Sequence, residues 1–143
     1  MKKFFFLFLV MGVLLVVGCS DNATAPTGSG GIGGGGNGGG GNTGGVTFTV
    51  TLQQVDQDNY QFVFTPNTGA VINTITANCA AANINNEQVA GDGTTVWNTN
   101  NPAGVTVPAN ILAQGQKWTF TIVGKVGSST GAAYTATANL TIQ

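Results

Sequence analysis

Histidine and arginine are absent from the sequence, and its charged residues are four lysines and five carboxylates among 143 residues. Without histidine the chain lacks the commonest general acid–base group, and without arginine it lacks the side chain that most often binds phosphate and carboxylate groups. So few cations also form no basic patch of the kind that binds nucleic acid. We therefore predict a protein that is not an enzyme and that has no nucleic-acid partner.

The few acidic residues form no catalytic or metal-binding pattern. Asp56 and Asp58 share a predicted turn, but the segment lacks the glycine and the distal glutamate of an EF-hand loop. Glu87 and Asp92 have the chemistry of a general acid–base pair, yet no Ser-x-Lys or Gly-x-Ser-x-Gly pattern supplies a nucleophile. The sequence predicts no catalytic residue, no metal site and no cofactor.

Long apolar runs are missing except at the start of the chain. Lys2 and Lys3 precede fourteen apolar residues, 4–17, which end at Gly18 and Cys19. A charged start, a short apolar run and a small residue before the cut are the parts of a secretory signal, whereas a membrane-spanning helix needs about 20 apolar residues. The ending Val-Val-Gly-Cys resembles the signal peptide of a bacterial lipoprotein.

This resemblance implies that residues 1–18 are removed and that the thiol of Cys19 carries acyl chains such as palmitate. Several acyl chains on one residue are enough for stable membrane attachment. Ser20 follows the cysteine, in place of the Asp that favours retention in the inner membrane, so the resemblance implies an outer-membrane lipoprotein, either periplasmic or surface-exposed. An uncleaved signal anchor is the alternative.

Cysteine is as scarce as charge, with Cys19 and Cys79 as its only instances. If Cys19 is acylated, the mature chain has one thiol and forms no intramolecular disulfide. No histidine is present to activate Cys79, so we predict a small buried apolar residue and not a nucleophile. The mature chain then has two lysines against five carboxylates, a formal charge of −3.

Residues 19–45 are predicted to form a flexible tether. In residues 28–45 thirteen of eighteen residues are glycine, and such a segment buries too little apolar surface to offset the entropy of ordering it. A random coil of this length has a root-mean-square reach of roughly 30 Å. The tether would hold a domain clear of the lipid headgroups.

Residues 46–143 change abruptly to alternating apolar and polar residues, the pattern of half-buried strands. The pattern predicts strands over 46–53, 60–65, 71–79, 105–107, 117–122 and 134–142. It also predicts a helical turn at 80–82, a hairpin turn at 91–93 between strands 87–90 and 94–98, and a loop over 124–131. The third strand is irregular, because its alternation places Asn73 on the inner face.

Seven or eight short antiparallel strands over about a hundred residues predict a single all-β sandwich. Residues 46–143 resemble immunoglobulin-like and fibronectin-type-III-like modules in strand number and pattern. The Cys-Trp-Cys framework of true immunoglobulin domains is absent. Because this architecture does not fix a function, the resemblance implies only a binding or display module.

The segment after Trp97 is the candidate binding loop. Trp97 precedes Asn98, Asn100 and Asn101, and an aromatic ring beside amides is typical of carbohydrate recognition. Packing of Trp97 in the core beside an ordinary turn is the alternative. We predict a cell-envelope lipoprotein that displays a non-catalytic binding module for a protein or glycan partner. A glycan-binding or enzyme-accessory module and a purely structural envelope component remain as alternatives.

Overall fold

The computed structural model describes residues 45–143. The predicted signal peptide, the acylated Cys19 and the glycine tether up to residue 44 lie outside the described residues, and they stay predictions. Within the described part, eight strands and two three-residue 3₁₀ turns follow one another along the chain. Neither of these turns is long enough for a helix that crosses a membrane.

The strands are β1 (Phe48–Gln54), β2 (Asn59–Pro66), β3 (Ala70–Cys79), β4 (Ile84–Ala90), β5 (Val96–Trp97), β6 (Ala103–Pro108), β7 (Lys117–Val126) and β8 (Ala133–Thr141). The 3₁₀ turns are η1 (Ala80–Ala82), which was predicted, and η2 (Ala109–Ile111).

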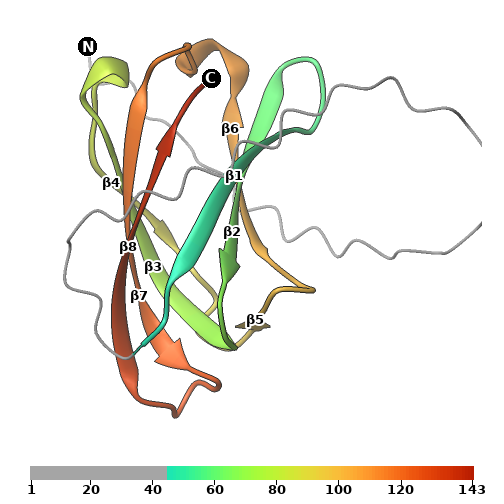
Figure 1. The fold of residues 1–143 in the computed structure, drawn as a ribbon, viewed down its shortest axis with the longest axis vertical. Coiled ribbons are helices and arrows are strands. Elements are labelled where there is room, and N and C mark those ends of the chain that lie inside the picture. Colours follow the sequence, from blue (N-terminus) through green and yellow to red (C-terminus); the bar gives the residue numbers. More distant parts are fainter. Residues whose placement is uncertain (1–44) are drawn as a thin grey trace, which may run out of the picture.

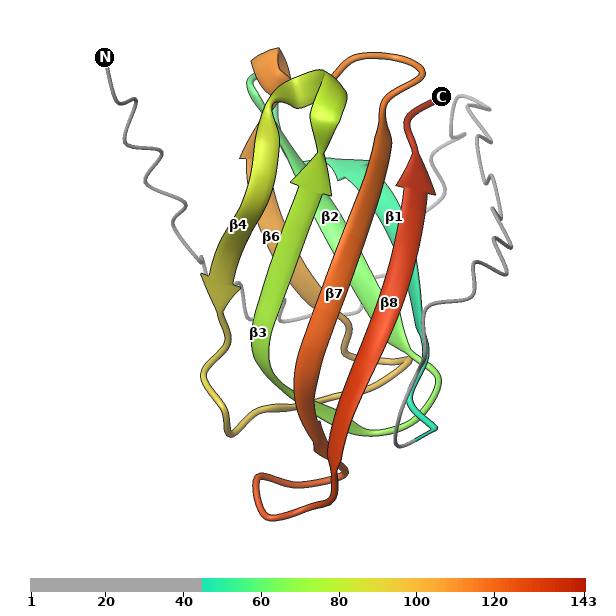
Figure 2. The same cartoon turned by 90° about the vertical axis from the view of Figure 1, so that its left-hand side faces the viewer.

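Two antiparallel sheets pack face to face, which confirms the predicted all-β sandwich. One sheet has the order β1-β2-β6, and the other has the order β4-β3-β7-β8, with β5 also paired to β3. Figure 2 shows the larger sheet in front of the smaller one, with β4 over β6 at one edge and β8 over β1 at the other. Figure 1 views the two layers along their edges, and the buried side chains of both sheets form one core between them.

Alternation decides which side chains enter this core. In β7 the inward residues Trp118, Phe120 and Ile122 are at most 2% exposed, whereas the residues between them face outward. The same alternation buries Phe48 and Val50 in β1. A half-buried strand has apolar side chains on the core face and polar side chains such as threonine on the face in water. Burying one apolar side chain contributes about 1.5–3 kcal/mol to stability.

The predicted inward position of Asn73 is wrong. A β-bulge shifts the pairing of β3 with β7 between Ile72 and Thr74, so Asn73 is exposed. The amide of Gly91 donates to the Asn73 carbonyl oxygen at 2.8 Å. An extra residue at a bulge reverses the inward and outward positions after it, which is how β3 buries both Ile72 and Ile75.

The predicted hairpin around residues 91–93 is also wrong. β4 pairs with residues 74–79 of β3, and β5 pairs with Ala70 and Val71 of the same strand. The two segments are therefore successive partners along one edge of β3, and they do not pair with each other. The chain between β4 and β5 passes from one part of the β3 edge to the next. Its glycines give this connection the same composition as a hairpin turn.

Gly124 lies inside β7 and not in the predicted loop, which is confined to the residues after Val126. Tyr134 of β8 reaches across Gly124, and its hydroxyl donates to the Val71 carbonyl oxygen of β3 at 3.2 Å. Burial raises the pKa of Tyr134 to about 12, because the charged phenolate loses its hydration inside the core. The glycine is what allows this contact between three strands.

The prediction for Cys79 is confirmed. Cys79 ends β3 with only 2% of its surface exposed, which agrees with a small buried residue. β6 pairs with β2 alone and ends at Pro108, so it is an edge strand. Proline cannot donate a backbone hydrogen bond to a neighbouring strand, which limits it to such edges and strand ends.

Candidate ligand-binding cleft

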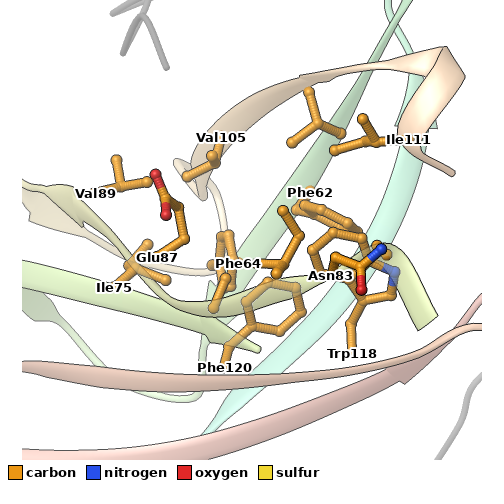
Figure 3. A pocket seen from close by; sticks show the side chains of 14 residues that line it. Phe62, Phe64, Ile75, Asn83, Glu87, Val89, Val105, Ile111, Trp118 and Phe120 are labelled. Atoms are coloured by element: carbon orange, nitrogen blue, oxygen red, sulfur yellow. The ribbon is translucent and has the colours of Figure 1, made fainter. Parts of the chain in front are cut away.

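The sandwich is closed at one edge and open at the other. At the closed edge β1 lies against β8, and the rings of Phe48 and Tyr134 are 5.9 Å apart. At the open edge β4 and β6 end their sheets, and an apolar cleft of about 410 Å³ enters between them. Figure 3 shows this cleft from close by.

Both sheets and both 3₁₀ turns contribute to its lining. The residues are Phe62 and Phe64 of β2, Ile75 and Ala77 of β3, Ala82 of η1, Asn83, Ile84, Glu87 and Val89 of β4 and its approach, Val105 and Val107 of β6, Ile111 of η2, and Trp118 and Phe120 of β7.

Four aromatic rings form the floor of the cleft. Phe120 meets Phe62 and Phe64 edge-on, with ring centroids 5.0 Å apart in both pairs, and Trp118 stands 4.9 Å from Phe62. Each of these four residues is at most 2% exposed. Edge-to-face pairs of this kind stabilise a core beyond the area they bury, by about 0.5–1.5 kcal/mol each. The floor is therefore a well-packed part of the core.

A hydrogen-bond network fixes the Trp118 end. The carboxamide of the buried Gln116 accepts from the indole Nε1 of Trp118 at 3.2 Å and from the Ala113 amide at 3.0 Å, and it donates to the Ile111 carbonyl at 3.0 Å. This network ties the η2 segment to β7. With its N–H used in this way, the indole offers the cleft an apolar surface.

Two polar side chains stand in the lining. Asn83 ends η1 in the left-handed conformation, with φ of 56°, which asparagine tolerates better than most residues. Glu87 shares the inward face of β4 with Val89, yet it is exposed because no strand covers this edge. Figure 3 shows Glu87 near Val89 and Val105 at one end of the cleft, and Asn83 near Trp118 and Ile111 at the other.

The remaining acidic turns are structural. The Asp92 carboxylate accepts from the Thr95 hydroxyl and from the amides of Thr94 and Thr95, and these bonds lower the pKa of Asp92. Asp56 likewise accepts from the Asn59 side chain and the Asp58 amide, which lowers its pKa. No three His, Cys, Asp or Glu side chains among residues 45–143 come together to hold a metal ion.

The segment after Trp97 forms a tight turn outside the cleft. Asn98 and Asn101 exchange two backbone hydrogen bonds of 3.0 and 3.1 Å, and the Asn98 side-chain oxygen accepts from the amides of Asn100 and Asn101. Trp97 is half-buried against the core, while Asn100 and Asn101 are exposed. The loop is accessible, but one of its three amides already holds the turn together.

Sequence reasoning named Glu87 only as an acid–base candidate and did not find the cleft. One signal was present: Glu87 lies two residues before the apolar Val89, so a strand over these residues puts both on the same face. A carboxylate on the core-facing side of a strand marks a place where the core is open to water. That signal pointed to β4 as an edge strand.

No family model and no curated protein matches the sequence. Among solved structures, the crystal structure of a Br derivative of BhCBM56, a carbohydrate-binding module, aligns with a TM-score of 0.38 and 16% identity. The alignment covers 66% of this chain and 90% of that chain. A likeness at this level supports no conclusion about this chain.

Proposed function

We propose that the chain is a cell-envelope lipoprotein whose sandwich is a non-catalytic binding module for an apolar ligand. The lipoprotein part rests on the sequence ending at Cys19, which supplies a cleavage site and an acylated anchor. The binding part rests on the cleft between β4 and β6. An anchored domain with an apolar cleft is suited to capturing or carrying amphiphilic molecules at the membrane.

The observation that carries this proposal is the combination of size and lining. Binding sites for small molecules have volumes of about 300–1,000 Å³ and mostly apolar walls with a few polar groups. The cleft has about 410 Å³ and twelve apolar residues beside two polar ones. A methylene group fills about as much space as a water molecule, about 30 Å³, so the cleft has room for roughly a dozen carbon atoms.

Decanol is expected to bind in this cleft. Its chain gains about 0.8 kcal/mol for each methylene removed from water, against an association cost of at least about 4 kcal/mol, which predicts a Kd of about 1 mM at best. The chain 19–143 with Cys19→Ala keeps every residue that the structure describes and carries no acyl group. In a Trp97→Phe background, Trp118 reports binding by its fluorescence, because it lines the cleft.

A filled cleft should lose this binding. Ala77 lines the cleft from β3, so Ala77→Phe places a ring inside it and should weaken decanol binding at least tenfold. Thr76→Phe, on the outer face of the same strand, is the matched control and should bind normally. If Ala77→Phe does not fold, Ala82→Leu serves in its place. Equal binding by both variants, or no binding by the parent, would refute the cleft as the site.

Glycan binding at the Trp97 turn is the second candidate, because the exposed Asn100 and Asn101 lie beside a half-buried ring. We expect Asn100→Ala with Asn101→Ala to weaken binding in a glycan-array screen while the melting temperature changes little, since both side chains face solvent. Adding Asn98→Ala removes the acceptor that holds the turn and should also lower stability. Unchanged glycan binding in the double variant would exclude this site.

A further inference from the structure

Charge is distributed unevenly around the cleft. Glu87 is the one charged side chain in its lining. The lysines of the described residues, Lys117 and Lys125, both project from the outward face of β7, on the far side of the larger sheet from the cleft. A ligand head that reaches the Glu87 end therefore meets a carboxylate and no cation.

The lining also lacks competing side-chain hydrogen-bond donors near Glu87. The indole N–H of Trp118 is bonded to Gln116, and the Asn83 amide stands at the opposite end of the cleft from Glu87 (Figure 3). The neighbours of Glu87 in the lining are the apolar Val89, Val105 and Ile75. At this end a carboxylate acceptor stands alone above an apolar wall.

We propose that Glu87 selects the head group of the ligand, and that the cleft takes amphiphiles with a single apolar chain and a cationic, hydrogen-bond-donating end such as an amine. This inference rests on the proposed apolar-ligand function. An ammonium group donates charge-assisted hydrogen bonds to a carboxylate, which are stronger than bonds between neutral groups. A fatty-acid carboxylate at the same place would repel Glu87 and find no cationic side chain in the lining.

Decylamine, decanol and decanoate test the proposal, because they share one chain and differ only in the head. Decylamine and decanoate are titrated below their critical micelle concentrations, and decanol below its solubility limit, into the chain 19–143 with Cys19→Ala and Trp97→Phe at low salt. We expect decylamine to bind roughly two- to fivefold more tightly than decanol, the range for an exposed ion pair, and decanoate to bind most weakly. Raising the salt concentration should compress these differences.

Two charge changes separate a local effect from a global one. Glu87→Gln removes the carboxylate and should make decylamine and decanol bind equally, and Glu87→Lys should reverse the order so that decanoate binds most tightly. Gln88→Lys changes the net charge by the same amount as Glu87→Gln, but on the outward face of β4, where Gln88 pairs with Thr76. It should keep the preference for the amine.

Each outcome bears on a definite claim. If decanol binds but the order of the three probes is the same in Glu87→Gln, the head-group role is wrong and the apolar cleft still stands. If none of the three binds, the proposed function fails with it.

Inward charges on edge strands also prevent sheets from joining edge to edge, so size-exclusion chromatography accompanies the titrations. If Glu87→Gln dimerises and the order of the three probes is unchanged, the role of Glu87 is to prevent edge-to-edge association and not to select the head group.

Discussion

Gly124→Ala should lower the melting temperature of the domain by about 15–30 °C, and Gly124→Val should leave it unfolded. A Cβ atom at this position would overlap the carbonyl oxygen of Val71 and stand 2.8 Å from the Tyr134 hydroxyl. The first neighbour is backbone in the middle of a sheet, so the strands themselves must move. Overpacking and an unpaired buried hydroxyl each cost about 1–3 kcal/mol. At about 2 kcal/mol for each, the total loss of about 4 kcal/mol lowers the melting temperature by about 4–8 °C per kcal/mol for a domain of this size.

Gly69→Ala is the matched control, because the same methyl group there meets Val96 at 3.4 Å and Gly127 at 3.7 Å, which are ordinary contacts. Its melting temperature should change by only a few degrees, since such a substitution alters stability by about 1 kcal/mol or less. Thermal melts followed by circular dichroism measure all three variants. If Gly124→Ala were as stable as Gly69→Ala, the glycine at position 124 would not be required for the contact of Tyr134 with Val71.

The same contact shows how far the sequence predicts this fold. The alternation of apolar residues with threonine placed Trp118, Phe120 and Ile122 correctly on the inner face, because that pattern depends only on neighbours in the sequence. Gly124 was assigned to a loop, because a glycine in a turn and a glycine beneath a tyrosine have the same sequence signature. The difference lies in a partner that is distant along the chain.

The two errors in the middle of the chain have the same origin. Asn73 faces outward because a bulge in β3 is fixed by its pairing with β7 and by the Gly91 amide. β4 and β5 share β3 as a partner, although the turn between them has the composition of a hairpin. Strand pairing is a long-range choice, and local composition does not determine it.

The cleft was beyond prediction for a related reason. A pocket between sheets exists only where two edge strands leave the core uncovered, and the order of strands in each sheet decides which ones these are. Sequence patterns mark residues such as Val89 and Phe120 as inward, but they do not tell a closed edge from an open one. Glu87 on the inner face of β4 was the one local sign of the opening.

Cys19→Ala is expected to abolish acylation of the chain and the membrane attachment that depends on it. If residues 1–18 are a lipoprotein signal, the unchanged protein should sediment with the membrane and carry an acylated Cys19 as its first residue, because each buried methylene of an acyl chain contributes about 0.8 kcal/mol to anchoring. The variant should either keep residues 1–18 or be released. Fractionation and mass spectrometry of the N-terminus distinguish these outcomes.

Cys79→Ala is the control for this experiment, since it removes the only other cysteine. Cys79 is 2% exposed at the end of β3, where no acylating enzyme reaches it. Its replacement should cost about 1 kcal/mol of stability by removing a buried sulfur atom, and it should leave the protein in the membrane fraction. The lipoprotein part of the proposal would be overturned if membrane attachment survived Cys19→Ala but was lost in Cys79→Ala. An intact Met1 on the natural protein would overturn it as well. Neither result bears on ligand binding in the cleft, which is tested separately.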